Sequence, residues 1–441
     1  MGSILFGVGV SPMSFKCKFV PVLVCGLLLG NGTAHSAQTK GFGGASAVDG
    51  ISADRRSISV PTYVDRNNQA LEFGVGFHER FLEPQDHTKL PIQLTVQNGT
   101  NKALRQELFE GVYRYSAIAG WGFLLDVNTG EILALASVDN KNISARWLSD
   151  DDGDSSHLTM GIYENAATSR LINIAMALDN GKVKLDSKLN TKDELKHGRF
   201  TITDTVPQNR NLSVEEVVYH SSYIGSARIA NKTSVEDFRA FFEKMGQIDR
   251  IRIPYLTDVE PIYPRNWTRL STLAISFGHG IATTPLQAGM ATAALINGGR
   301  LINPTIIKLA DHSSNPEYKR VVSSITSDRI RHLLRRNAEI GDSKVIDIPG
   351  YEVGGISATS PMVVNGKYSN EKFITSFTSV FPISEPKYLL MVMLNQPQGN
   401  AESNESKSAP WNAGEISKRI IPQVAKTLGV SRQNITTKSG M

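Results

Sequence analysis

The sequence contains 441 residues, of which 40% are hydrophobic and 20% are charged. This composition is sufficient for at least one large buried core and excludes a disordered or fibrous protein. Lysine and arginine number 47 against 42 acidic residues, and the resulting net charge of +5 is too small and too evenly spread to predict a nucleic-acid-binding protein. The length suits two or three domains, or one large mixed domain with an inserted lobe.

An export signal is predicted at the start of the chain. Lys16 and Lys18 precede an apolar run over residues 19–29, and small residues follow it. We therefore expect residues 1–37 to be a signal peptide and the protein to be exported to the periplasm or cell envelope. An uncleaved anchor is the alternative, and it is the only membrane contact that we expect.

The two cysteines, Cys17 and Cys25, both fall within the predicted leader. The mature chain is therefore expected to have no disulfide, no thiolate metal site and no cysteine nucleophile. Residues 38–60 are rich in Gly, Ala and Ser without an apolar period, which predicts a flexible tether. A disordered tail is expected at residues 431–441.

The predicted elements run from strands through helices and back to strands. A strand is expected at 92–96, a helix at 101–117, and a hairpin with strands at 121–127 and 131–137. Helical patterns follow at 168–179, 213–230, 234–246, 285–295 and 326–338. Short β-rich runs at 351–353, 374–382 and 388–394 precede an amphipathic helix at 415–428. This order favours one α/β sheet that both ends of the chain complete around an inserted helical lobe.

Three segments carry distinctive motifs. Residues 125–137 read LDVNTGEILALAS, residues 278–287 read GHGIATTPLQ, and residues 294–299 read ALINGG. In this order they resemble D-x-x-T-G-x-I-L-A-M-A-S, G-x-G-I-x-x-T-P-L-Q and A-L-x-N-G-G of the transpeptidase domain of penicillin-binding proteins. Residues 64–68, VDRNN, are similar to the I-x-D-R-N-G segment of class B members.

The resemblance implies a β-lactamase-like α/β (α+β) fold, in which an antiparallel sheet is covered by helices and carries an inserted all-helical lobe. This transpeptidase-like domain is expected over residues 91–430, after a short remnant of the class B pedestal at 61–90. The family's activity is D,D-transpeptidation in peptidoglycan synthesis through a serine ester. The resemblance implies neither a cofactor nor a metal ion.

The first catalytic motif of this family is S-x-x-K on a helix, where the amine can take the proton of the serine hydroxyl. Residues 163–170, YENAATSR, are similar to the family's Y-E-P-G-S-T-x-K. Residue for residue, Ala167 stands at the nucleophile and Arg170 at the lysine. Alanine has no nucleophilic atom, and arginine does not lose its proton in proteins.

The other two motifs are also altered. In the second, S-x-N, Ser221 keeps the serine while Tyr223 replaces the asparagine. In the third, K-T-G, the three positions are occupied by Ile356, Ser357 and Ala358. Residues 369–372 spell S-x-x-K, but this segment is expected to be a polar loop after the strand of the third motif, and the match is attributed to chance.

Three hypotheses follow. The first is a catalytically inactive protein that acts as a scaffold or regulator by binding proteins of cell-wall synthesis or division. The second is a D,D-transpeptidase or carboxypeptidase that uses a displaced serine, Ser221 or Ser169. The third is a module that binds peptidoglycan stem peptides without a covalent bond. The cleft-binding candidates for this module are Arg170, Ser221, Ser357 and Thr359. For Arg170 we favour a structural role, in which it fills the space of the lysine and pairs with a nearby carboxylate.

Overall fold

The computed structural model describes residues 63–67, 69, 92–140, 156–159, 161–251, 253, 259–308 and 316–433. The predicted leader and tether lie outside these residues, as do most of the expected pedestal remnant and the end of the expected tail. Among the helices that can be described, none is both long and apolar enough to span a membrane.

A five-stranded antiparallel sheet is built by the two ends of the chain, in the order β11-β12-β13-β3-β4. The early part of the chain supplies β3 (Ala119–Asp126) and β4 (Ile132–Asp139). The late part supplies β11 (Gly354–Val364), β12 (Lys367–Phe381) and β13 (Tyr388–Asn395). β13 pairs with β3 along its full length, from Tyr388 opposite Asp126 to Asn395 opposite Ala119. The predicted sheet is therefore confirmed.

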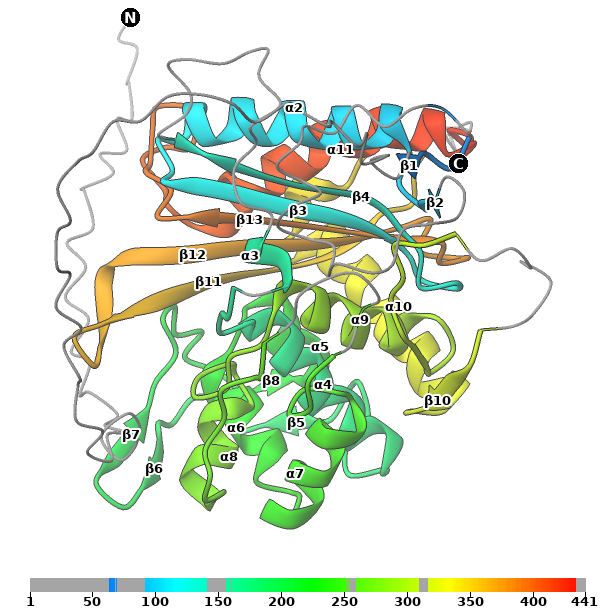
Figure 1. The fold of residues 1–441 in the computed structure, drawn as a ribbon. Coiled ribbons are helices and arrows are strands. Elements are labelled where there is room, and N and C mark those ends of the chain that lie inside the picture. Colours follow the sequence, from blue (N-terminus) through cyan, green and yellow to red (C-terminus); the bar gives the residue numbers. More distant parts are fainter. Residues whose placement is uncertain are drawn as a thin grey trace, which may run out of the picture.

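Helices cover both faces of the sheet (Figure 1). On one face lie α2 (Asn98–Arg114) and α11 (Ala413–Thr427), and on the other lie α4 (Ala166–Asp179), α9 (Pro285–Ile296) and α10 (Ser324–Ile340). Alternate side chains of each strand enter the two cores. Leu390 and Val392 of β13 pack with α2 and α11, whereas Met391 and Met393 pack with the opposite helical layer.

The layers approach closely at two glycines. A Cβ atom on Gly111 of α2 would lie 2.2 Å from Cδ1 of Ile416 on α11, and one on Gly289 of α9 would lie 2.4 Å from Cζ of Phe123 on β3. Both distances are far below van der Waals contact, so each glycine permits a spacing that a larger residue would prevent.

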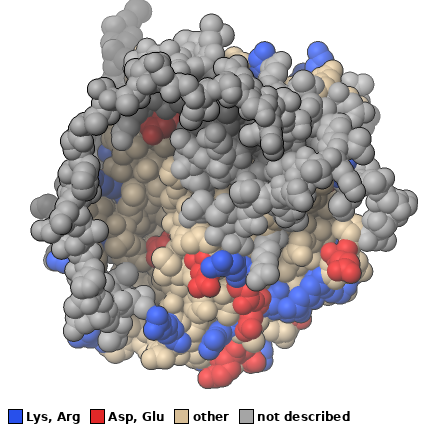
Figure 2. Space-filling model, in the orientation of Figure 1, with Lys and Arg blue, Asp and Glu red and all other residues tan. Residues whose placement is uncertain are grey.

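The inserted lobe lies between α4 and α9 in the sequence. Its helices are α5 (Val214–Tyr219), α6 (Tyr223–Ala230), α7 (Val235–Lys244) and α8 (Arg269–Ile275). It also carries two short ladders, formed by β5 (Lys188–Leu189) with β8 (Leu212–Ser213) and by β6 (Leu195–His197) with β7 (Phe200–Ile202). On the face drawn in Figure 2, basic and acidic side chains are interspersed over the lower part of the molecule, where the lobe lies.

The helix predicted over 213–230 is wrong in one respect, because the chain breaks it into α5 and α6. Ser221 lies at the break with φ of 50°, in the left-handed region. The carboxylate of Asp204 accepts hydrogen bonds from the Ser222 hydroxyl at 2.8 Å and from the Ile224 N–H at 2.9 Å. These bonds satisfy groups at the start of α6, so a new helix begins there.

Two strand predictions and one loop prediction also need correction. Residues 351–353 are not a strand, since β11 begins at Gly354 after a turn with positive φ at Gly350 and Glu352. Residues 369–372 belong to β12 and not to a loop, because β12 continues past the sheet to pair with β11 alone. The strand expected at 92–96 is reduced to β2 (Ile92–Gln93), which pairs in parallel with β1 (Tyr63–Val64).

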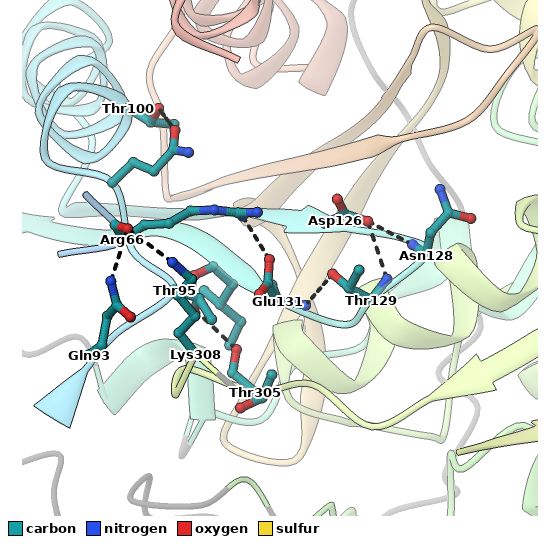
Figure 3. A network of polar contacts seen from close by, with 12 residues as sticks. Arg66, Gln93, Thr95, Thr100, Asp126, Asn128, Thr129, Glu131, Thr305 and Lys308 are labelled. Carbon is teal, nitrogen blue, oxygen red and sulfur yellow. Dashed lines mark hydrogen bonds and ion pairs between the residues drawn. The ribbon is translucent and has the colours of Figure 1, made fainter. Parts of the chain in front are cut away.

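The segment around Arg66 is tied to the sheet by the polar network in Figure 3. Nη1 of Arg66 donates to Oε2 of Glu131 at 2.7 Å, and Glu131 is only 3% exposed. The Arg66 carbonyl accepts from Gln93 and from Lys308. In the adjoining turn, Asp126 accepts hydrogen bonds from two backbone N–H groups. Two segments that the sequence singled out by resemblance, 64–68 and 125–137, are thus in direct contact.

Candidate functional site

The first motif lies at the N-terminal end of α4, directly against the 278–287 segment. Asn165, which precedes the helix, donates from Nδ2 to the carbonyl and the hydroxyl of Thr283, both at 3.0 Å. Gly278 has φ of 100°, and a Cβ atom there would lie 2.2 Å from the Cα atom of Ala166. Only glycine permits this approach, so the two motif segments are held backbone against backbone.

Ala167, at the nucleophile position, is 2% exposed. It belongs to the same apolar cluster as Ile356 and Ala358 of β11, which are 1% and 5% exposed. Helix α4 packs against β11, and the hydroxyl of Ser360 donates to the carbonyl of Glu164 at 3.0 Å. The structure therefore brings the first and third motifs together, and it fills the space between them with methyl and aliphatic groups.

Arg170 is one turn further along α4 and is 2% exposed. Its Nη1 donates to the Ser221 hydroxyl at 2.8 Å, and its Nε is buried without a hydrogen-bond partner in the described part of the chain. The sequence predicted a carboxylate partner, but the direct partner is a hydroxyl. Burial lowers the pKa of Arg170, whereas the longer-range charges of Tyr223, Asp342 and Asp204 raise it. Guanidinium keeps its proton at neutral pH, so a buried cation occupies the lysine position.

Asp342 completes the surroundings of Ser221 and was not anticipated from the sequence. It follows the C-cap of α10, and its N–H donates to the Tyr219 carbonyl at 3.1 Å. Burial raises the pKa of its carboxyl, while a hydrogen bond with the Ser221 side chain and the charge of Arg170 act in the opposite direction. The Ser221 hydroxyl therefore lies between a cation and a carboxyl. No motif marks Asp342, since it comes close to Ser221 only in the folded chain.

Tyr223, at the asparagine position, is part of a column of aromatic rings. Its ring stacks on Phe277 with centroids 4.8 Å apart and meets the edge of His279 at 5.7 Å. His279 in turn stacks on Tyr368 of β12 at 4.6 Å. An amide that could hold a peptide group is thus replaced by a stacked ring, and the column joins α6 to the β11–β12 hairpin.

Glu164 lies beside this column. Its Oε1 accepts hydrogen bonds from the Gly280 N–H at 2.7 Å and from the Tyr368 hydroxyl at 2.8 Å. Burial raises the pKa of Glu164 to about 7, although both hydrogen bonds lower it. Burial also lowers the pKa of His279 to about 4. From the sequence, Glu164 and His279 were recognised only as positions within the motif segments, and no role was predicted for them. Nothing in the sequence pattern indicated a role for Tyr368.

The remaining candidates are spread along β11 and α4. Ser357 is 6% exposed, and Thr359 accepts a hydrogen bond at Oγ1 from the N–H of Ala409. Ser169, the other displaced serine considered, is 5% exposed on α4. Within the described ranges, no group of three or more His, Cys, Asp or Glu side chains is arranged to hold a metal ion.

A scan against protein families matches the penicillin binding protein transpeptidase domain over residues 120–421. The chain therefore belongs to the penicillin-binding protein transpeptidase family. It is 30% identical over 352 residues to the probable peptidoglycan D,D-transpeptidase FtsI of Caulobacter vibrioides, a match that covers 78% of this chain and 60% of the relative. It is 25% identical over 350 residues to the peptidoglycan D,D-transpeptidase FtsI of Escherichia coli, covering 78% and 58%. The chain thus spans about three fifths of the length of these relatives.

Solved structures agree on the fold. The transpeptidase domain of penicillin-binding protein 3 from Burkholderia pseudomallei matches with a TM-score of 0.66 and 24% identity, covering 79% of this chain and 99% of that one. Penicillin-binding protein 3 from Mycobacterium tuberculosis, in complex with ampicillin, matches with a TM-score of 0.72 and 18% identity, covering 86% and 97%. The predicted fold class and family are confirmed.

Proposed function

We propose that this chain is a catalytically inactive penicillin-binding-protein-like protein of the cell envelope. In this role it is exported to the periplasm and acts by binding, as a scaffold or regulator of peptidoglycan synthesis or division. The observation that carries the proposal is the buried methyl group of Ala167 at the nucleophile position, beside the buried cation of Arg170. Its partners are proteins of cell-wall synthesis or division.

The chemistry of acyl transfer supports this function. A serine ester requires a hydroxyl nucleophile and a group that accepts its proton. Arg170 donates a hydrogen bond to the Ser221 hydroxyl, and its guanidinium cannot accept a proton from a nucleophile. In a serine hydrolase, loss of the nucleophile alone reduces the rate on the order of a million-fold. Ile356 removes the cation of the third motif as well.

Packing supports the same conclusion. The motif side chains on α4 and β11 are between 1% and 6% exposed: Ala167, Arg170, Ile356, Ser357 and Ala358. These side chains therefore offer almost no surface to a substrate peptide. A binding role that uses other surfaces of the retained fold does not require them to be exposed.

The test is covalent labelling of the purified full chain by a fluorescent penicillin, read by denaturing gel and by intact mass. Penicillin-binding protein 3 from Mycobacterium tuberculosis, whose structure was solved in complex with ampicillin, is prepared in the same way and serves as the positive control. We expect no adduct on this chain under conditions that label the control fully. A stoichiometric acyl adduct would overturn the proposal.

A second candidate function is hydrolysis or transfer through Ser221. One observation favours it, because the carboxyl of Asp342 contacts the Ser221 hydroxyl and could accept its proton. The test is release of D-alanine from a peptide ending in D-Ala-D-Ala, compared between the wild type and Ser221→Ala. Turnover that disappears in the variant would establish this function, and no turnover in the wild type would exclude it.

A third candidate, non-covalent binding of stem peptides, has less support from the geometry. Arg170 is enclosed and bonded to Ser221, and Thr359 is bonded to Ala409. Calorimetry with muropeptides on the wild type and on Arg170→Ala tests it. Saturable heat that is lost in the variant would favour binding through the guanidinium, and equal heats would leave Arg170 a structural role.

A further inference from the structure

Half of the β11–β12 hairpin extends beyond the sheet. Pairing of β12 with β13 ends at Ile374, opposite Asn395, and residues 361–372 pair only within the hairpin. We call residues 361–372 the tip segment. Figure 1 shows it reaching past the neighbouring strands on the side of the helical lobe. A two-stranded hairpin is marginally stable alone, so the tip segment depends on contacts outside the sheet.

Met362 packs against the apolar cluster of α4 and the lobe, and Tyr368 makes the polar and aromatic contacts of the tip segment. Its hydroxyl donates to Glu164, which immediately precedes the α4 region, and its ring stacks on His279. Glu164 also binds the N–H of Gly280, and its carbonyl accepts from Ser360 at the base of the tip segment. The carboxyl group of Glu164 and the phenol of Tyr368 thereby join the tip segment, the residues before α4 and the 278–287 segment.

We propose that Glu164, His279 and Tyr368 form a latch that closes the β11–β12 hairpin over the N-terminal end of α4. In the closed state the latch holds the tip segment against the lobe and keeps the motif positions of α4 and β11 enclosed. Release of Tyr368 removes the hydrogen bond to Glu164 and the ring contact with His279, so that the packing of Met362 alone opposes movement of the tip segment away from α4 among its described side-chain contacts outside the hairpin. The latch would hold the hairpin in a catalytic chain and in a non-catalytic chain alike.

Two buried atoms show that the closed state disfavours charge. Oε2 of Glu164 and Nε2 of His279 are both buried, and neither has a hydrogen-bond partner among the described residues. An isolated charge at either atom would be costly. The raised pKa of Glu164 and the lowered pKa of His279 follow from the same burial. The closed latch therefore holds a neutral carboxyl and a neutral imidazole between about pH 4 and pH 7.

Opening exposes both groups to water, where their pKa values return to about 4.3 and about 6.5. Between these values the opened latch has a carboxylate and an imidazolium, so it carries the same number of protons as the closed one. Two tyrosines face the pair, Tyr368 and Tyr223, and burial raises the pKa of Tyr223 above its ordinary value of about 10. The equilibrium for opening the wild-type latch is therefore nearly independent of pH from about 4.5 to about 6.5. If only Glu164 or only His279 titrated, the same equilibrium would depend on pH.

The first test is hydrogen–deuterium exchange of the tip segment in the native full chain at pH 6. Tyr368→Phe removes the hydroxyl and keeps the ring, and the exposed Tyr318→Phe is the matched control. We expect tip-segment amides to exchange about fivefold faster in Tyr368→Phe, as the loss of one hydrogen bond implies, while amides of β3 and β13 keep their protection. Equal tip exchange in Tyr368→Phe and the control would overturn the latch.

The second test separates the two titrating groups. In His279→Phe only Glu164 remains; because its closed-state pKa is raised, protection of the tip segment should fall as the pH rises from about 4.5 to 7. In Glu164→Gln only His279 remains; because its closed-state pKa is lowered, protection should rise from about pH 4 to 6.5. Each slope is at most about tenfold per pH unit, after correction for intrinsic exchange. If both variants keep the flat wild-type profile, the proton balance assigned to the latch is wrong.

Discussion

The guanidinium of Arg170 and the hydroxyl of Ser221 lie 2.8 Å apart and join α4 to the break between α5 and α6. In this family these positions belong to two different catalytic motifs, and here they form a buried structural contact. Its donor is a cation, so the bond is stronger than one between neutral groups. The retained serine accordingly has a role in stability that needs no catalysis.

Ser221→Ala tests this role. The variant removes the acceptor of a buried guanidinium, and hydrogen bonds to charged groups contribute about 1.5–3 kcal/mol. We expect the free energy of unfolding to fall by about 2 kcal/mol in chemical denaturation, and the exposed Ser431→Ala to leave it unchanged. Equal stability of the two variants would mean that Arg170 does not depend on Ser221.

Restoring the hydroxyl alone should not restore acylation. In Ala167→Ser the introduced group would face Arg170, which cannot take its proton, and β11 would still lack its lysine. We expect no β-lactam adduct by intact mass after prolonged incubation. An adduct on the introduced hydroxyl would show that a proton acceptor other than residue 170 serves the site.

Gly278 and Gly280 provide a matched pair for the contact between the first motif and the 278–287 segment. Both have positive φ, but a Cβ atom meets the Ala166 backbone only at Gly278, and meets nothing within 4 Å at Gly280. We expect the free energy of unfolding to fall by about 1 kcal/mol in Gly280→Ala. In Gly278→Ala we expect it to fall by about 4 kcal/mol, or the variant to fail to fold. Thermal unfolding of both variants measures the difference, and similar losses would mean that the close approach relaxes easily.

The network of Figure 3 makes the N-terminal segment part of the stability of the sheet. Arg66→Met removes the cation that Glu131 binds while Glu131 stays buried. Removing one partner of a buried ion pair lowers the free energy of unfolding by about 3–5 kcal/mol. Because Arg66 is partly exposed, we expect a decrease of about 2 kcal/mol. Urea denaturation of Arg66→Met, compared with the exposed Arg265→Met, measures this decrease. No difference between them would place the Arg66 segment outside the cooperative unit.

Glu216 should contribute a pH-dependent stability at the start of α5. Partial burial raises its pKa, but hydrogen bonds from Ser213, Arg210 and Lys188 outweigh this and lower the pKa to about 2. A depressed folded-state pKa stabilises the fold above the unfolded value of about 4.3 and loses that effect as the pH falls toward 2. We expect Glu216→Gln to have a lower free energy of unfolding than the wild type at pH 6. This difference in stability should disappear as the pH falls below 4.

The control for that experiment is Glu236→Gln, an exposed acid in the first turn of α7. It should show a small gap that does not change over the same range of pH. Urea midpoints at four pH values for the three proteins are sufficient. If the stability difference between Glu216→Gln and the wild type stayed constant with pH, the Glu216 carboxylate would not have the assigned role of accepting the Ser213 N–H at the start of α5.

Periodicity and turn residues predicted the sheet and most helices, because those elements bury one regular face each. The hairpin around Asn128 and the helix that ends before Asn297 are examples. The break at Ser221 could not be predicted from the neighbouring residues. It depends on hydrogen bonds to Asp204, which is distant in the sequence and belongs to no recognised motif. The extent of β12 was missed because its polar outer half, around Asn370, lacks the apolar alternation of a buried strand.

For the site, the resemblance assigned Arg170 and Ser221 to two separate motifs, and in the folded chain these two residues are in direct contact. The partners that set their environment were not predictable. Asp342 and Tyr368 approach the motifs only through tertiary packing, and whether a cleft is open or filled depends on the sum of many side-chain volumes. The hydroxyl partner of Arg170 was likewise decided by the turn at Ser221, which the sequence did not indicate.

Gly289 fixes the spacing between α9 and β3 at one point of the molecule. Because it has no side chain, the backbone of α9 lies directly against the ring of Phe123, and the two layers are closely packed there. The tip segment has no such neighbour in the sheet, since it pairs only within the β11–β12 hairpin. A ligand that binds at the tip segment would therefore displace it at a lower cost in packing than a ligand that had to separate α9 from β3.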